Sequence, residues 1–208
     1  MVISDMKHKM DPKQFGNQKH LGIQHYLIRL LHRILVSTDK NSKGEIAAVL
    51  CLFVDWKQAF SRQCHTLGVK SFKENGVRPS LLPLLISYFE GRRMRVKWRG
   101  TLSNERQLPG GGAMGATLGI WEYLSQTNDN GDSIPVEDRF KFVDDMTVLE
   151  VINLVNVAIQ TYDVINHVPS DIAGHNQFID GKELKSQEYL KDLNQWSKKK
   201  DEHFTRKD

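Results

Sequence analysis

The chain has 208 residues, of which 39% are hydrophobic and 26% are charged. This composition is that of an ordinary globular domain, and it excludes a disordered tail, a collagen-like repeat and a disulfide-rich scaffold. The formal net charge is only +4, so it permits nucleic-acid binding without arguing for it, and the distribution of the charges matters more than their sum.

The sequence predicts neither a membrane span nor a signal peptide. Its longest apolar run, residues 46–54, is far shorter than the ~20 residues that a membrane span requires, and its first residues lack the basic-then-apolar order of a signal peptide. Cys51 and Cys64 lie outside any metal-binding spacing and are expected to be reduced thiols. We therefore expect an intracellular protein with no membrane partner, and the sequence leaves open whether it acts in the cytoplasm or the nucleus.

The first third of the chain predicts an irregular start, a helix and a buried strand. Residues 1–20 are polar and indicate an irregular segment. Apolar residues then recur with helical spacing and predict a helix over residues 23–37. These apolar residues are Ile23, Leu27, Leu30, Leu31, Ile34 and Leu35. Residues 46–54 are apolar on both faces, which predicts a strand buried on both sides that leads directly into Asp55.

Two helices and a basic strand are predicted next. The helices span residues 62–75 and 79–90 and end at glycines. Residues 93–99 alternate strictly, which predicts a half-buried strand with Met94, Val96 and Trp98 on its inner face and basic residues on its outer face. Such a face suits a phosphate backbone, and the alternative is a solvated strand surface. We expect nucleic-acid contact from Arg92, Arg93, Arg95 and Lys97.

The last part of the chain combines a glycine-rich loop with an acidic hairpin. The loop, residues 110–119, leads into a helix predicted over residues 117–127, and residues 140–149 predict a β-hairpin with Asp144 and Asp145 at its tip. Further helices are predicted over residues 151–164 and 186–199. Because no repeat or Pro-rich linker interrupts the chain, we expect one domain over residues 21–197, between a polar segment (1–20) and a charged tail (198–208).

Three aspartates are the candidates for chemistry. If their strands are antiparallel neighbours, Asp55 lies beside Asp144 and Asp145. Carboxylates gathered at one sheet edge repel one another unless divalent cations neutralise them. Such a cluster suits two Mg²⁺ ions about 3.5–4 Å apart, the arrangement of in-line phosphoryl transfer. Taken singly, the acidic pair also fits a solvent-exposed turn, and Asp55 also fits a helix N-cap.

The order of these residues resembles the reverse transcriptase domain of non-LTR, LINE-like retrotransposons, from about residue 14 to about residue 196. Leu52-Phe-Val-Asp55-Trp-Lys-Gln-Ala-Phe60 resembles motif A of that family, and Phe142-Val-Asp-Asp145 resembles motif C. The segment Gln14-Phe-Gly-Asn-Gln-Lys resembles the block that precedes motif A. The resemblance implies that Asp55 and Asp144 are catalytic metal ligands and that Asp145 is their less essential neighbour. It also implies that Phe60 underlies the incoming sugar and disfavours ribonucleotides.

Gly112-Ala-Met-Gly115-Ala-Thr-Leu-Gly119 is similar to motif B, the loop and helix that touch template and nucleotide, which implies nucleotide binding at Gly115. The family usually has Pro-Gln-Gly there, and Met114 cannot replace the hydrogen bonds of the Gln amide. Ser61 stands where many relatives have a second acidic residue. No primer-grip motif is recognised, and we expect no thumb and no endonuclease domain within these residues.

The resemblance implies an α+β polymerase palm, an antiparallel sheet with flanking helices, with partial fingers and the thumb missing. The implied activity is that of an RNA-directed DNA polymerase, a nucleotidyltransferase that extends a primer 3′-end with two Mg²⁺ ions, or Mn²⁺ instead. Its partners would be an RNA template with a DNA primer and deoxynucleoside triphosphates, with thumb and endonuclease domains in a full-length relative. Two alternatives stay open: a truncated, inactive retroelement remnant that at most binds nucleic acid, and a two-metal nuclease that uses the same carboxylates.

Overall fold

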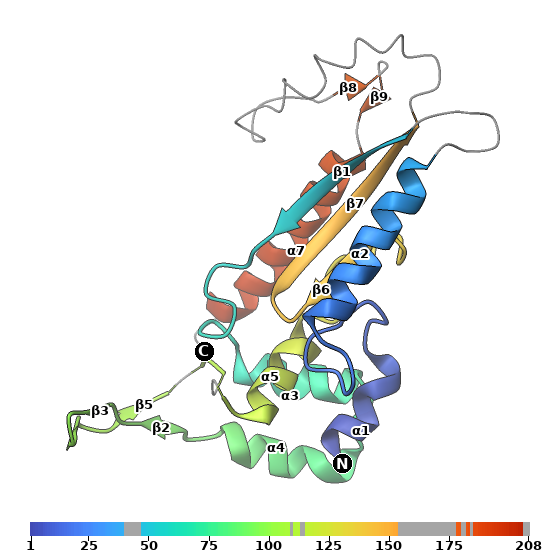
Figure 1. Ribbon diagram of the computed structural model, residues 1–208. Helices are drawn as coiled ribbons and strands as arrows, with labels where there is room; N and C mark the ends of the chain where they lie inside the picture. The colour runs from blue at the N-terminus through green and yellow to red at the C-terminus, as the bar shows by residue number, and fades with distance from the viewer. Residues whose placement is uncertain are drawn as a thin grey trace.

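The protein is an α+β structure with antiparallel sheets, as the sequence predicts. The computed structural model describes residues 1–39, 47–108, 110–112, 115–153, 178–179, 182–183 and 185–205. Its central sheet has three strands in the order β1-β7-β6, formed by β1 (Ala47–Val54), β7 (Asp145–Asn153) and β6 (Arg139–Phe142). Both strand pairs are antiparallel, and Figure 1 shows the sheet running through the upper part of the molecule.

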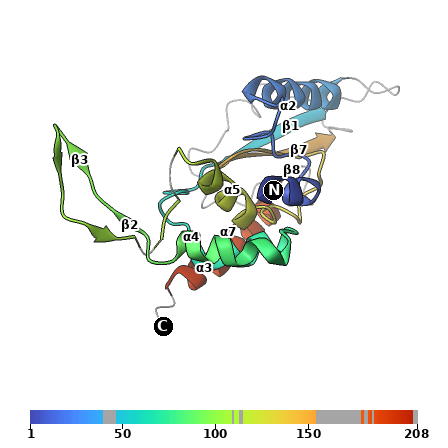
Figure 2. The ribbon, with the colours of Figure 1, turned by 90° about the horizontal axis from the view of Figure 1, so that it is seen from below.

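One helix covers each face of this sheet. α2 (Ile23–Thr38) packs on one face and α7 (Lys185–Thr205) on the other, and Figure 2 shows them on opposite sides of β1 and β7. Alternate side chains of β7 pack in two different apolar clusters, one on each face of the sheet, because successive side chains of a strand point to opposite faces. Leu149 packs in the cluster with Tyr26 of α2, whereas Met146 packs with Tyr189 of α7.

A layer of helices lies below one end of the sheet (Figure 1). It contains α1 (Val2–Met6), α3 (His65–Glu74), α4 (Leu82–Phe89) and α5 (Thr117–Gln126), with 3₁₀ turns at Lys7–Lys9 and Pro79–Leu81. These helices share an apolar core around Met6, Phe72, Leu85 and Trp121. The core holds α5, which follows the glycine-rich loop, against the segment that follows β1.

Two hairpins of short strands complete the structure. The first hairpin contains two pairs of strands. β2 (Arg93–Met94) pairs with β5 (Arg106–Gln107), and closer to the turn β3 (Lys97–Trp98) pairs with β4 (Thr101–Leu102). Figures 1 and 2 show this hairpin, residues 92–108, standing away from the helices beyond α4, and we call it the arm. β8 (Phe178–Ile179) pairs with β9 (Lys182–Glu183). No helix in the described ranges is long and apolar enough to cross a bilayer.

Several expectations about elements were wrong. Residues 1–20 are not irregular throughout, because α1 forms where Met6 packs into the helical core. Residues 93–99 are not half-buried, since all of them are exposed on the arm. The strand of β1 is not buried on both sides, because it lies at the edge of the sheet, where its residues are half-buried and Phe53 is exposed. Residues 151–153 extend β7 rather than begin a helix, and residues 154–164 lie outside the described ones.

Candidate active site

The three predicted aspartates lie at the same end of the central sheet. Val54, the last residue of β1, pairs with Met146 of β7, so Asp55 leaves the sheet beside Asp145 and the turn that holds Asp144. Asp55 and Asp145 are exposed and Asp144 is half-buried. Desolvation raises the pKa of the Asp145 carboxyl above its usual value, and the charges of Asp144 and Asp55 raise it further. The carboxylate of Asp145 therefore lies close enough to Asp144 and Asp55 to be repelled by both.

The turn that carries Asp144 has a strained backbone. Phe142 pairs with Asp145, so Val143 and Asp144 form a two-residue turn between β6 and β7. Val143 has φ of 59°, in the left-handed region that a β-branched residue rarely adopts. Such a conformation persists only where surrounding contacts hold it, and the residue that it positions is the candidate metal ligand Asp144.

The side chain of Gln14 holds this turn. Its Oε1 accepts a hydrogen bond from the Val143 amide at 2.9 Å, and its Nε2 donates to the Val143 carbonyl at 3.4 Å. The same Oε1 accepts from the amide of Gly16 at 2.9 Å. A Cβ on Gly16 would lie 2.4 Å from the Val143 side chain, so this close approach requires glycine. The resemblance of residues 14–19 to the block before motif A does not reveal this contact, which only the fold creates.

The carboxylates at this end of the sheet are of the type that binds Mg²⁺, but they are few. Mg²⁺ prefers oxygen ligands and is commonly held by one or two carboxylates together with water and substrate phosphates. Asp55 and Asp144, which lie at the same end of the sheet, supply two such carboxylates. Within the described residues, no group of three or more His, Cys, Asp or Glu side chains is placed to hold a metal ion. A metal here would therefore depend on phosphate oxygens as further ligands.

An aromatic pair connects the aspartates to the glycine-rich loop. Phe60 stacks on Tyr123 of α5 with ring centroids 4.9 Å apart, and the Phe60 carbonyl accepts a hydrogen bond from the Gly112 amide at 2.7 Å. Burial raises the pKa of the Tyr123 phenol, and the negative charges of Asp144, Asp145 and Asp55 raise it further. Tyr123, which the sequence does not identify, therefore lies within electrostatic range of all three aspartates.

The glycine-rich loop lies close against the segment that follows Phe60. The amide of Gly111 donates to the carbonyl of Gln63 at 2.8 Å, and a Cβ on Gly110 would lie 2.8 Å from that carbonyl oxygen. Gly115 has φ of +85° with open space around it, so its backbone is accessible beside the start of α5. The departure from the family pattern at Ala113 and Met114 lies outside the described residues.

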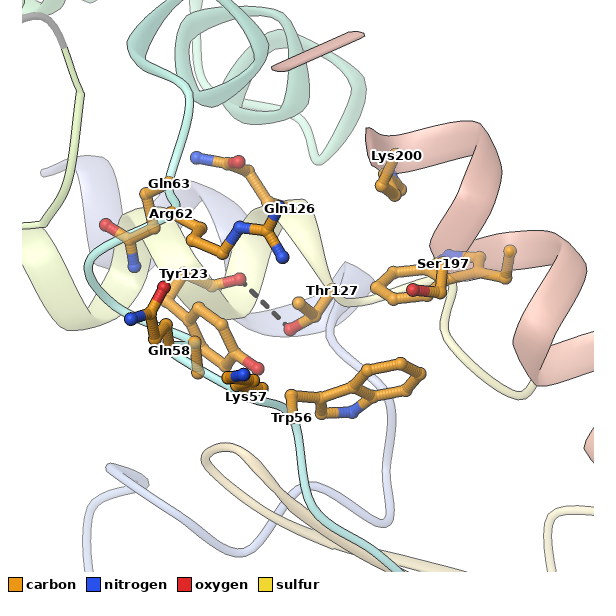
Figure 3. A pocket seen from close by; sticks show the side chains of 12 residues that line it. Trp56, Lys57, Gln58, Arg62, Gln63, Tyr123, Gln126, Thr127, Ser197 and Lys200 are labelled. Atoms are coloured by element: carbon orange, nitrogen blue, oxygen red, sulfur yellow. Dashed lines mark hydrogen bonds between the residues drawn. The ribbon is translucent and has the colours of Figure 1, made fainter. Parts of the chain in front are cut away.

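A pocket of about 240 Å³ is lined by Trp56, the residue that follows Asp55, and by none of the three aspartates. Figure 3 shows Trp56, Lys57 and Arg62 on one side of it and residues of α7 on the other. Trp56 packs against Trp196 with ring centroids 5.2 Å apart, and Tyr123 also lines the pocket. The cations that line it are Lys57, Arg62 and Lys200. Aromatic walls with cations suit an anionic ligand that carries a ring.

The basic residues predicted to bind nucleic acid do not line this pocket. Arg93 and Arg95 lie on the arm and pair with Glu105, each at 2.9 Å. Arg92, at the base of the arm, stacks on Tyr88 with its guanidinium 4.9 Å from the ring centroid, and Lys97 is exposed in β3. The structure therefore separates two features: acidic residues with a pocket, and a basic arm.

Comparison with known proteins finds a partial similarity to a protein that is named as a polymerase. No family model matches the chain. A segment of 107 residues is 30% identical to a protein of Drosophila melanogaster named probable RNA-directed DNA polymerase from transposon X-element. The match covers 50% of this chain and 11% of that relative. This partial similarity supports a reverse-transcriptase-like relationship, in agreement with the motifs at Asp55 and Asp144.

Proposed function

We propose that this chain carries the palm of an RNA-directed DNA polymerase, which adds deoxynucleotides to a primer 3′-end under the direction of an RNA template. The single observation that carries the proposal is the position of Asp55 beside Asp145 and the turn that holds Asp144, at one end of an antiparallel sheet. The similarity to the X-element polymerase supports the same class of reaction.

The aspartates would hold the metal in this proposal. Asp55 and Asp144 are the ligands and Asp145 assists them, with two Mg²⁺ ions or Mn²⁺ instead. Bound there, the ions would neutralise charge on the transferred phosphoryl group and lower the pKa of the attacking hydroxyl. Gln14 keeps the turn of Asp144 in place through its two hydrogen bonds to Val143.

The pocket lined by Trp56 would receive the incoming deoxynucleoside triphosphate. Its cations, Lys57, Arg62 and Lys200, balance the negative charge of the phosphates. Phe60, fixed by its stacking on Tyr123, lies five residues after Asp55 and limits the room next to the sugar. The backbone at Gly115 is open to solvent and can approach the nucleotide. Arg92, Arg93, Arg95 and Lys97 would contact the phosphates of the RNA template and DNA primer.

Primer extension tests this proposal. The full chain is incubated with an RNA template, a DNA primer, Mg²⁺ and the four deoxynucleotides, beside Asp144→Asn and the control Asp39→Asn, which changes an exposed aspartate at the end of α2. We expect extension by the wild type and by Asp39→Asn, and a loss of at least about a hundredfold in Asp144→Asn. Equal extension by Asp144→Asn and the wild type would contradict the proposal.

A second candidate is a catalytically inactive remnant that binds nucleic acid. It is favoured by the absence, in the described part of the chain, of three side chains converging on one metal position. This candidate predicts that the folded chain binds a template–primer duplex and extends no primer at any Mg²⁺ or Mn²⁺ concentration. Extension that is abolished by Asp144→Asn would rule it out.

A further inference from the structure

The arm has a well-formed backbone, and the described part of the chain packs on neither of its faces. Its tip is a two-residue turn of Arg99 and Gly100, both with positive φ (45° and 86°), the type I′ geometry that suits a hairpin. Trp98 and Thr101 pair across that turn. Every residue from 93 to 107 is exposed, and Figure 2 shows the arm reaching away from α4. Because the side chains of this hairpin are not buried against the other described residues, they are available to a partner.

The net positive charge of the chain is concentrated in the arm. Six basic residues and one acidic residue give residues 92–108 a net charge of +5, whereas the whole chain carries +4. The acidic residue is Glu105, which pairs with Arg93 and Arg95 on the exposed surface. Exposed ion pairs contribute little free energy, so a phosphate group can displace Glu105 from these guanidinium groups. The charge therefore favours a polyanion as the partner.

An exposed tryptophan stands at the tip of this basic arm. The side chain of Trp98 is 71% exposed, and the guanidinium of Arg99 lies 5.7 Å from its ring centroid. Met94, Val96 and Leu102 of the arm are also exposed. Aromatic side chains beside cations bind single-stranded nucleic acid, because an indole stacks on a base while the cations follow the phosphates.

We propose that the arm binds single-stranded nucleic acid, with Trp98 stacked on an unpaired base. A duplex exposes base faces only at its ends, so stacking at Trp98 selects an unpaired strand over a duplex. The inference rests on the proposed function for the identity of the strand, which is then the unpaired part of the RNA template. The binding itself needs neither metal nor nucleotide.

Fluorescence anisotropy with the full chain and EDTA tests the arm. The probes are a labelled oligouridylate and a blunt RNA–DNA hybrid of the same length. We expect tighter binding of the single strand, a loss of about fivefold or more in Trp98→Ala, and largely retained binding in Trp98→Phe. The matched control is Phe53→Ala, which removes another exposed ring (73% exposed) from β1 and leaves the arm intact. We expect the affinity of this variant to be unchanged.

The outcomes distinguish the proposed binding of single strands by the arm from the proposed polymerase function. Binding that depends on Trp98, together with a failure of primer extension, would support the arm and contradict the proposed function. Equal affinity of wild type and Trp98→Ala for the single strand would overturn the inference. If sedimentation then showed that Trp98→Ala abolishes self-association, a second copy of the chain would be the partner of the arm instead.

Discussion

At the scale of single residues, the turn at Val143 is the clearest case of local strain maintained by a distant side chain. Val143 has φ of 59°, and Gln14 binds both its amide and its carbonyl across 129 residues of sequence. Because Asp144 is the next residue, the position of its carboxylate depends on this contact. Gln14 is thus a positioning residue for the candidate site and touches none of the reacting groups itself.

We expect Gln14→Ala to destabilise the protein by about 1–3 kcal/mol, because the substitution leaves a partly buried backbone amide without its acceptor. Urea unfolding gives the free energy of unfolding of the variant and of the control Gln24→Ala, which changes an exposed glutamine of α2. Gln14→Ala should also weaken divalent-cation binding, while Gln24→Ala should change neither property. Equal stability of the two variants would show that the turn does not need Gln14.

A second residue-scale prediction concerns the buried carboxyl of Glu122 in α5. Its side chain is fully buried, and burial raises its pKa from 4.5 to about 8. Between these two values the unfolded chain releases a proton that the folded chain keeps, so stability falls as the pH rises through that window. Glu122→Gln is neutral at every pH and should be more stable than the wild type at pH 8 by roughly 3–5 kcal/mol.

Chemical denaturation from pH 4 to pH 9 checks this. Glu122→Gln should lose the fall in stability, and Glu90→Gln, which changes an exposed glutamate after α4, should keep it. A Glu122→Gln variant with the wild-type pH dependence would contradict the assignment of the fall to this carboxyl.

At the scale of elements, a buried ionic cluster attaches the N-terminal segment to β6. The carboxylate of Asp11 pairs with Lys141 at 2.7 Å and with Arg139 at 3.0 Å, and all three side chains are buried. Burial alone would raise the pKa of Asp11, but the charges of Lys141 and Arg139 outweigh it and hold the pKa below the usual value. Asp11 lies three residues before Gln14, so these ion pairs fix the segment from which Gln14 reaches the turn at Val143.

We expect Asp11→Asn to cost about 3–5 kcal/mol, because it removes the buried anion of Lys141 and Arg139 and leaves Arg139 with its exposed partner Asp132. The stabilisation by Asp11 is present above the pKa of the unfolded carboxyl and is lost as the pH falls through the lower folded pKa. Thermal and urea unfolding measure both effects. Asp132→Asn is the matched control, since it removes an exposed partner of the same Arg139 and should cost less than about 1 kcal/mol. Similar costs for both substitutions would contradict the role of the buried cluster.

The elements that the sequence predicts correctly are those with a local pattern. α2 follows from its period of apolar residues and β1 from its apolar run, although β1 is a half-buried edge strand and not a strand buried on both sides. The hairpin of β6 and β7 is also predicted, but its two-residue turn is Val143 and Asp144 rather than the acidic pair. The strand of residues 93–99 was predicted half-buried because alternation indicates two faces but does not say whether anything packs on either. α1 was missed because its five residues are held by packing of Met6 in the helical core rather than by their own propensity.

At the scale of the whole molecule, the candidate site brings together residues that no short motif contains. The sequence identifies Asp55, Asp144 and Asp145, because their residue types and their order along the chain can be read from the sequence itself. It misses Tyr123 and Gln14, since each acts through contacts across tens of residues or more that only the fold creates. The separation of charge between a basic arm and an acidic sheet end is likewise a property of the folded chain.

Divalent-cation binding at the sheet end tests the central claim most directly. Mn²⁺ is titrated into the full chain, and free Mn²⁺ is followed by electron paramagnetic resonance for the wild type, Asp55→Asn, Asp144→Asn and the exposed control Asp39→Asn. We expect the wild type and Asp39→Asn to bind Mn²⁺ equally, and each of the other two variants to bind at least about tenfold more weakly, because a carboxylate ligand is lost. Equal binding by all four proteins would show that Asp55 and Asp144 do not hold a metal, and would contradict the proposed polymerase site.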